Sequence, residues 1–239
     1  MKKDKKIKIY LGLIYLLILS LFLWVFFSNF SLNDLTSYDF IKDNRNHLVS
    51  IKERNFFFIS FLFIIISIIW VFLLGFGLPI LIPAGFIFGK WIGTILCIFS
   101  LSVGATFLYL FASYFFKDLI EEKFSKNFKN LSHKFKKNEF IFFLIYRFVG
   151  GIPFQIQNLL PVLFDVKVRN YFFGTLFGIA PQIFVWVSLG SGIEKIIDQN
   201  IEFPSFKDLI LSQDIYLPII GFLILMISAL LVKNFFYKD

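Results

Sequence analysis

Charged residues are scarce in this sequence, and their scarcity argues against an ordinary soluble protein. Only 17% of the 239 residues are charged, whereas 58% are hydrophobic. A soluble domain needs a larger share of polar and charged side chains to cover its surface. The composition therefore predicts an integral membrane protein.

Cysteine and histidine are equally rare, and this excludes several kinds of site. The single cysteine, Cys97, lies within an apolar run, so the chain can form neither an internal disulfide nor a thiolate metal cluster. The two histidines, His47 and His133, lie in separate polar segments on predicted opposite sides of the membrane. That separation argues against a shared metal site or His-based catalysis. We expect no metal and no cofactor.

The sequence instead contains several long apolar runs. Four of them are long enough for a transmembrane helix, which needs about 20 residues. They cover residues 9–27, 91–116, 171–189 and 215–232. The first run follows five lysines and has no small-residue cleavage site after it, which favours a retained helix over a signal peptide.

Two further apolar stretches, residues 55–89 and 140–164, are interrupted by glycine and proline, which disfavour a continuous helix. The first is uncharged and too long for one span. In the second, each arm has about ten residues and reaches about 15 Å, half of the roughly 30 Å hydrocarbon core. We predict that both stretches fold back as re-entrant helical hairpins. The predicted breaking residues are Gly77, Pro79, Pro83 and Gly85 in the first stretch and Gly150, Gly151 and Pro153 in the second.

The distribution of charge predicts the orientation. The amino terminus carries five lysines, and residues 117–137 carry seven lysines against three acids, whereas residues 191–214 carry five acids and two lysines. Cytoplasmic loops are enriched in Lys and Arg, so both termini and residues 117–137 are predicted to be cytoplasmic. Apolar residues at helical spacing within 117–137 predict an amphipathic helix on the lipid surface. The net charge of +8 is thereby explained without a nucleic-acid partner.

Four crossings between these loops require the two hairpins to open toward opposite faces. The short patterns Gly77-Leu-Pro79 and Gly151-Ile-Pro153 occur at their breaks. Inverted repeats with broken helices meet near the midplane of transporters and build the transport site there. The fold class predicted is therefore an all-α polytopic membrane protein with transmembrane helices and two inverted re-entrant hairpins.

Arg147 is the one charge predicted deep inside a hairpin, shortly before the Gly-Gly break. A charge at that depth costs several kcal/mol unless it is paired or hydrated. Beyond the break follow three amides, Gln155, Gln157 and Asn158, which need partners because lipid offers none. We predict Arg147, Gln155 and Asn158 as a substrate-binding set, because a guanidinium suits phosphate. The alternatives are an Arg that snorkels or caps the broken helix and amides that tie the hairpin to its neighbours.

Two motifs in this sequence resemble a known family. The first runs Arg147-Phe-Val-Gly-Gly-Ile-Pro153-Phe154, then Asn158, Gly174-Thr175, Gly178, Pro181 and Gly190. The second runs from Pro79 through Pro83-Ala-Gly85-Phe-Ile-Phe-Gly89 to Gly93 and Gly104-Ala105. Together they cover about residues 78–192 and are similar to the signature of the VTT-domain family, also called the DedA or SNARE-associated membrane protein superfamily.

The resemblance implies two facing re-entrant hairpins and the flipping or scrambling of phospholipids or polyprenyl phosphate carriers. Some positions depart from the family pattern. Gly150 stands where a proline is common, Pro161-Val162 where a glycine follows the asparagine, and Tyr114 near a usual arginine. Residues 55–89 have no acidic counterpart to the acids of some relatives, which argues against proton coupling by that route.

The sequence thus predicts three segments: residues 1–54, an amino-terminal transmembrane helix and extracytoplasmic loop; residues 55–192, the VTT-like core; and residues 193–239, a loop and a carboxy-terminal transmembrane helix. The predicted function is translocation of an anionic or phosphate-bearing lipid across the cytoplasmic membrane, with ion coupling and homo-oligomerisation left open. The alternative is a non-transporting factor that organises the membrane or assists assembly. Catalysis is not expected, because Gly190-Ser191-Gly192 and Glu121-Glu122 lack the partners that a hydrolase needs.

Overall fold

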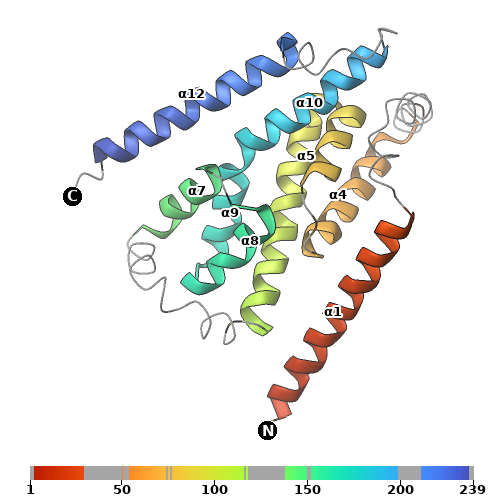
Figure 1. The fold of residues 1–239 in the computed structure, drawn as a ribbon, viewed down its shortest axis with the longest axis vertical. Helices are drawn as coiled ribbons and strands as arrows, with labels where there is room; N and C mark the ends of the chain where they lie inside the picture. Colours follow the sequence, from red (N-terminus) through yellow and green to blue (C-terminus); the bar gives the residue numbers. More distant parts are fainter. Residues whose placement is uncertain are drawn as a thin grey trace.

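The computed structural model describes residues 3–29, 50, 54–73, 75, 77–115, 117, 138–149, 152–198 and 211–236, and all elements within them are helices (Figure 1). In chain order they are α1 (Lys3–Asn29), α4 (Phe56–Phe72), α5 (Leu78–Phe115), α7 (Glu139–Val149), α8 (Phe154–Leu159), the 3₁₀ helix η1 (Leu160–Phe164), α9 (Val168–Gly178), α10 (Ala180–Asp198) and α12 (Gln213–Phe236). The predicted surface helix falls on residues 118–137, outside the described part.

The first interrupted stretch folds back on itself. α4 ends at Phe72, and residues 78–88, the first arm of α5, return along it. Phe56 and Phe63 of α4 both meet Phe88 edge to face, with ring centroids 6.2 and 5.2 Å apart. The two ends of this stretch therefore lie together, and we call α4 with residues 78–88 hairpin 1.

Gly89 then turns the chain a second time. Its φ of 74° and ψ of 172° break α5, and residues 90–115 form a second arm that runs back past the first. The reversal is tight, because a Cβ added at Gly93 would lie 2.6 Å from the Ala84 carbonyl oxygen. Glycine suits Gly89 because other residues rarely adopt a positive φ with an extended ψ.

The position of this break corrects the prediction for Pro83 and Gly85. Both residues lie inside the helical 78–88 arm and do not interrupt it. Pro83 forfeits one backbone hydrogen bond near the start of the helix, and the packing of the arm offsets that loss. Gly85 is needed for packing instead, because a Cβ there would lie 1.9 Å from the Val187 carbonyl oxygen of α10. Gly77 and Pro79 do stand at the turn between α4 and α5.

The second interrupted stretch also folds back. α7 ends at Val149, Pro153 directly precedes α8, and α8 continues into η1. Gly150 and Gly151 lie outside the described residues. Tyr146 donates from its hydroxyl to the Gln157 carbonyl at 3.1 Å, and Gln157 Nε2 donates to the Tyr146 carbonyl at 3.0 Å. These reciprocal bonds join the arms of what we call hairpin 2, made of α7, α8 and η1.

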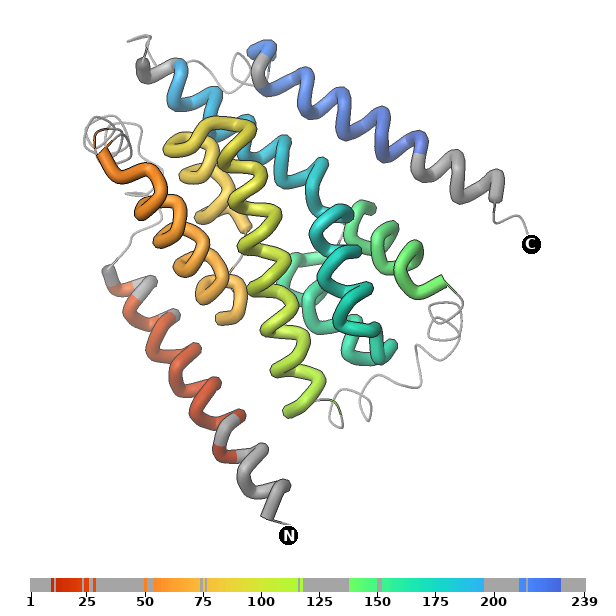
Figure 2. The backbone as a smooth tube through the Cα atoms, turned by 180° about the vertical axis from the view of Figure 1, so that it is seen from behind, coloured from red at the N-terminus to blue at the C-terminus, as the bar shows by residue number. Residues whose placement is uncertain are grey.

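The two hairpins open toward opposite ends of the 90–115 arm. The two ends of hairpin 1 meet beside Gly89, where that arm begins, and this end of the arm lies uppermost in Figure 1. The two ends of hairpin 2 meet beside Lys117, just past the end of the arm, where Lys117 forms an ion pair with Asp165. The tube in Figure 2 follows the same course from behind. The arm rises about 39 Å at 1.5 Å per residue, which exceeds the thickness of a hydrocarbon core.

After hairpin 2 the chain continues through α9 into α10, with a bend of 44° between them. The predicted span over 171–189 therefore coincides with a bent pair of helices rather than with one continuous helix. The helical pair begins at Val168, changes direction at Ile179 and ends at Asp198. Pro181 lies just after the bend, where its missing N–H and its ring disfavour a straight helix.

Glycines allow α10 to cross hairpin 1 at very short range. An added Cβ at Gly190 would lie 2.1 Å from the Ile82 carbonyl oxygen, in addition to the contact of Gly85 with Val187. Small residues of this kind let the backbones of membrane helices approach closely. α1 and α12 lie on opposite flanks of this core in both ribbon and tube views.

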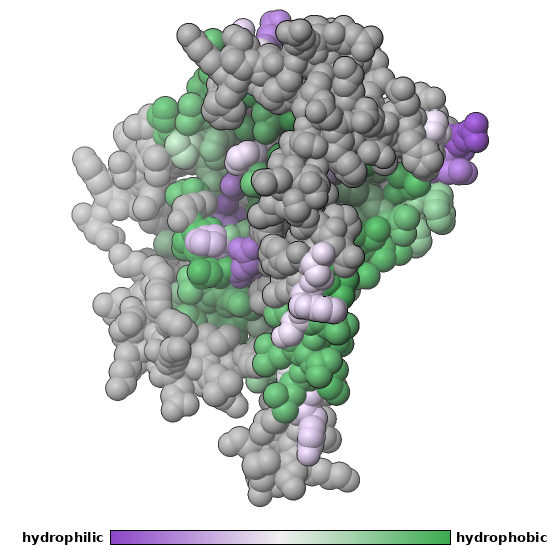
Figure 3. Space-filling view, turned by 45° about the vertical axis from the view of Figure 1, so that its right-hand side comes forward, coloured by the Kyte–Doolittle hydropathy of each residue, from purple (hydrophilic) through white to green (hydrophobic). Residues whose placement is uncertain are grey.

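In α4 and in the 90–115 arm, small polar side chains are buried while several large apolar side chains face outward. In α4, Ser60 and Ser67 are buried, whereas Phe57 is 87% exposed. In the 90–115 arm, Ser100 and Ser102 are buried, whereas Ile95 is 67% exposed. Hydrophobic residues dominate the described surface in Figure 3. Water would oppose so large an apolar surface, and lipid would favour it.

Among the described helices, Leu78–Phe115 is long and apolar enough to cross a bilayer, and the bent pair Val168–Gly178 with Ala180–Lys195 gives a second candidate when taken as one span. The predicted spans at residues 9–27 and 215–232 coincide with α1 and α12. Their described apolar segments are shorter, Gly12–Phe22 and Ile215–Ser228.

Candidate functional site

Arg147 is completely buried in the last turn of α7, near the tip of hairpin 2. All three of its nitrogens bond to neighbouring side chains. Nη1 donates to Asn158 Oδ1 at 2.7 Å, Nη2 to the Tyr171 hydroxyl at 2.7 Å, and Nε to Thr175 Oγ1 at 3.1 Å. Tyr171 in turn donates to the Asn158 carbonyl at 3.1 Å. The guanidinium is thus held between α8 and α9.

Aromatic rings surround the same guanidinium. Its central carbon lies 5.1 Å from the ring centroids of Phe143 and Tyr171, and 6.0 Å from that of Phe154. Tyr171 stacks on Tyr109 of α5 with centroids 4.3 Å apart. Ring faces attract a cation, and the attraction is strongest where water is absent. These contacts stabilise the charge in place but do not neutralise it.

Two glycines of α9 make room for this arrangement. A Cβ added at Gly178 would lie 2.5 Å from Arg147 Cβ, and one added at Gly174 would lie 2.6 Å from Phe143 Cδ1. Because α9 can approach α7 this closely, Thr175 and Tyr171 reach the guanidinium from one side while Asn158 reaches it from the other.

The charge of Arg147 has no carboxylate partner among the residues that the structure describes. Its acceptors are one amide and two hydroxyls, all neutral. The carboxyl end of α7 adds a favourable dipole, because the last turn of a helix attracts a cation. Burying a cation without a counter-ion nevertheless costs several kcal/mol. The site is therefore electrostatically suited to an anion.

The predicted amides have different roles. Asn158 is buried and bonds to Arg147, whereas Gln157 is buried and ties the arms of hairpin 2 through Tyr146. Gln155 is half-buried and is not among the hydrogen-bond partners of Arg147, so the structure does not bring all three predicted residues together. Tyr171 was not predicted as a site residue, and Thr175 was named only as part of the Gly174-Thr175 motif.

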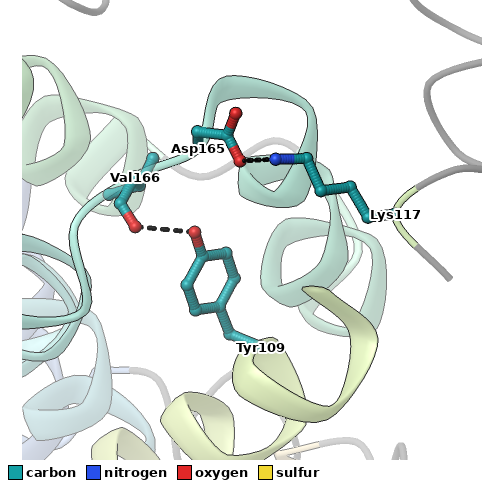
Figure 4. A network of polar contacts seen from close by, with 4 residues as sticks. All are labelled: Tyr109, Lys117, Asp165 and Val166. Carbon is teal, nitrogen blue, oxygen red and sulfur yellow. Dashed lines mark hydrogen bonds and ion pairs between the residues drawn. The ribbon is translucent and has the colours of Figure 1, made fainter. Parts of the chain in front are cut away.

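A second polar network lies at the end of hairpin 2 away from its tip, where the two ends of the stretch meet. Glu139 accepts hydrogen bonds from the Lys167 backbone N–H and, at 3.0 Å, from Asn170 Nδ2, so its carboxylate caps the start of α9. Nearby, Lys117 pairs with Asp165, and Tyr109 donates to the Val166 carbonyl at 2.6 Å (Figure 4). A carboxylate at a helix amino terminus is favoured by the unpaired N–H groups there. This network holds both ends of residues 140–164 together.

The tip of hairpin 1 has no comparable cation. Its break is capped from α1, where the buried Tyr15 donates to the Phe72 carbonyl at 2.8 Å. That carbonyl belongs to the last turn of α4, whose final carbonyls have no partner within the helix. α1 therefore completes the backbone hydrogen bonding of hairpin 1.

Comparison with known proteins identifies the family of the middle of the chain. Residues 76–192 match the VTT domain, nearly the range over which the sequence resembles that family. The chain is a VTT-domain protein. It is 23% identical to a transmembrane protein 41 homolog of Caenorhabditis elegans over 195 residues, which are 79% of this chain and 75% of the relative. It is 30% identical to the transmembrane protein 41 homolog of Dictyostelium discoideum over 160 residues, or 64% of this chain and 46% of the relative.

No solved structure matches the chain. The VTT domain and the two relatives identify it as a membrane protein of the VTT or DedA family. The matched residues contain hairpin 2, the 78–88 arm of hairpin 1, Gly89 and every side chain that contacts Arg147, whereas α4 precedes the matched range. The described Arg147 site therefore belongs to the family domain rather than to the flanking helices.

Proposed function

We propose that this VTT-domain protein translocates an anionic lipid, or a lipid-linked phosphate, across the cytoplasmic membrane. The observation that carries the proposal is a fully buried guanidinium without a carboxylate partner in the described part of the chain. A phosphate would supply the missing negative charge and would accept paired N–H bonds from the planar guanidinium.

The two hairpins support the same proposal. They open toward opposite ends of the 90–115 arm, so in a bilayer each would enter from a different face and return to it. In this orientation the basic residues of 1–8 and 117–137 lie on the cytoplasmic side. Tips that meet from opposite faces shorten the apolar barrier that a lipid headgroup must cross.

In the described conformation each guanidinium nitrogen of Arg147 donates one hydrogen bond to a neutral acceptor of its own protein. A phosphate would bind it by replacing some of these acceptors, of which Asn158 and Tyr171 lie nearest at 2.7 Å. The exchange is favourable in charge, because a phosphate brings to the buried cation the negative charge that its neutral acceptors do not supply. Gln155 lies about one helical turn from Asn158 and is the third residue of the proposed binding set.

The proposal is tested by a flipping assay in proteoliposomes, with a fluorescent anionic phospholipid and a membrane-impermeant quencher. Arg147→Ala should slow flipping by about tenfold or more, because charge-assisted hydrogen bonds are worth about 1.5–3 kcal/mol. Arg147→Lys should also slow it, because Lys keeps the charge but loses the planar fork. The exposed Arg169→Ala is the matched control and should flip at the wild-type rate.

Full flipping by a well-folded Arg147→Ala protein would remove this residue from the mechanism. Absence of any lipid movement by the wild-type protein would instead favour the non-transporting alternative. The hydrogen bonds of Arg147 to Asn158, Tyr171 and Thr175 favour that alternative, because they equally suit a residue whose task is to hold the hairpin.

A further inference from the structure

A cavity of about 630 Å³ lies apart from Arg147, between α12 and the core. One face of α12, from Gln213 to Leu225, forms one wall, and Pro181 and Phe184 of α10 form the other. Lys90, the first residue after Gly89, also lines it. The size is typical of pockets that bind small organic ligands.

The lining of this cavity is divided by polarity. Lys90 and Gln213 are its polar residues, and both begin a helical segment, Lys90 the 90–115 arm and Gln213 helix α12. Every other lining residue is apolar or a glycine. Gly221 keeps the wall open, because a Cβ added there would have no heavy atom within 4 Å. The cavity is therefore an apolar groove with a cationic end.

The length of the groove matches one leaflet. Gln213 and Leu225 are twelve residues apart on one helix, which corresponds to about 18 Å at 1.5 Å per residue. Half of a hydrocarbon core is about 15 Å thick. With Lys90 at the headgroup level, the apolar part of the groove ends near the midplane. There the ring of Phe222 lies 5.8 Å from that of Phe148, the residue next to Arg147.

We propose that this groove binds one anionic phospholipid of the surrounding bilayer, with its phosphate at Lys90 and Gln213 and an acyl chain along α12 toward Phe222. Charge complementarity and the one-leaflet length are the two observations that select a lipid as the occupant. The inference rests on the proposed function, because the groove then serves as the lateral entry to the tip of hairpin 2. It is separate from the Arg147 site, since Arg147 does not line it.

Native mass spectrometry of protein extracted from vesicles of phosphatidylglycerol and phosphatidylcholine tests the assignment. Wild-type protein should retain one phosphatidylglycerol in preference to phosphatidylcholine. Gly221→Phe fills the groove, and Lys90→Gln removes its charge. Each should lower the lipid-bound fraction about tenfold. For Lys90→Gln this is the loss expected when one charged hydrogen-bonding contact is removed, and for Gly221→Phe the added ring takes the space of the acyl chain. Ile224→Phe adds the same ring to the exposed outer face of α12 and should retain the lipid.

Retention of phosphatidylglycerol by Gly221→Phe at the wild-type level would overturn the groove as its site. Loss of a dimer rather than of a lipid in that variant would show that a second copy of the chain occupies the groove, and would also overturn the proposal. Arg147→Ala should retain the lipid while losing flipping. If the wild-type protein holds the lipid in the groove but flips none, the proposed function is wrong and the assignment of the groove as a lipid site stands.

Discussion

At the scale of single residues, the site consists of one cation and the neutral groups that hold it. Arg147 is stabilised by three hydrogen bonds, by ring faces and by the carboxyl end of α7. Hydroxyls and amides suit a site that must release its cation to a stronger acceptor, whereas a carboxylate would compete with a lipid phosphate for the same N–H groups. The neutrality of the ligand set is therefore consistent with exchange.

Thr175 provides the sharpest single-residue test of this network. Thr175→Val keeps the shape of the side chain but removes the acceptor for Arg147 Nε. We expect it to lower the free energy of unfolding by about 1–3 kcal/mol, the cost of leaving a buried donor unsatisfied. Thr175→Ser keeps the hydroxyl and should lie much closer to wild type. Thermal unfolding in detergent measures both, and equal melting temperatures for Val and Ser would contradict the described bond.

Tyr15 offers a second test at this scale, in a part of the chain outside the matched domain. Tyr15→Phe removes the donor to the Phe72 carbonyl and should destabilise the protein by about 1 kcal/mol. Tyr10→Phe changes an exposed tyrosine of the same helix and should have no effect. Chemical denaturation in mixed micelles compares the two, and identical unfolding midpoints would show that α1 does not cap hairpin 1.

At the scale of elements, close helix crossings fix the position of hairpin 1 against α10. The Gly85 and Gly190 contacts leave no room for a methyl group, and in both cases the obstructing atom is a backbone oxygen that cannot rotate away. Residues 78–88 and α10 therefore pack as backbones in contact. This explains why glycine stands inside these helices despite its cost in conformational entropy.

Substituting these glycines should therefore distinguish the cost of overpacking a helix crossing from the gain in intrinsic helix propensity. Gly190→Ala raises intrinsic helix propensity by about 1 kcal/mol but overpacks the crossing. We expect a net loss of about 1–3 kcal/mol, seen as a lower melting temperature. Gly221→Ala, in the open wall of α12, gains the same propensity without a clash and should be neutral or stabilising. A stabilised Gly190→Ala protein would show that the crossing is looser than described.

Sequence patterns predicted the elements better than their junctions. The fold-back of residues 140–164 was indicated by arm length and by Pro153, both of which are local properties. Pro83 and Gly85 were predicted to break the first stretch, but both lie within the helical 78–88 arm and the backbone turns at Gly89. The close approach of Gly93 to Ala84 across this turn is not visible in the local sequence. The bend at Ile179 was likewise missed. Tyr171 and Thr175 escaped notice because pairing between α7 and α9 is not visible from either helix alone.

At the scale of the whole molecule, the arrangement of the helices makes a prediction about sidedness. In a Cys97→Ser background, cysteines at Asn138 and Val168 flank hairpin 2, and a cysteine at Asn55 stands at the open end of hairpin 1; all three positions are exposed. Membrane-impermeant maleimide should label Asn138→Cys and Val168→Cys from the cytoplasmic face only, and Asn55→Cys from the opposite face only.

Intact spheroplasts and inverted vesicles distinguish the two faces in this experiment. Labelling of the Asn138 and Val168 positions from different sides would make residues 140–164 an ordinary span, and the proposed meeting of two hairpin tips would then have to be abandoned. Labelling of Asn55 from the cytoplasm would leave hairpin 2 intact but remove the inverted relation between the hairpins.

The cap that Glu139 places on α9 also bears on how the protein is made. The Glu139 carboxylate is held by the Lys167 backbone and by Asn170, which are synthesised about thirty residues later. Each arm of hairpin 2 is too short for the translocon to recognise as a transmembrane segment of its own. A nascent chain that ends before Lys167 lacks the donors that close the loop, so the hairpin can settle into the bilayer only after the start of α9 has left the ribosome.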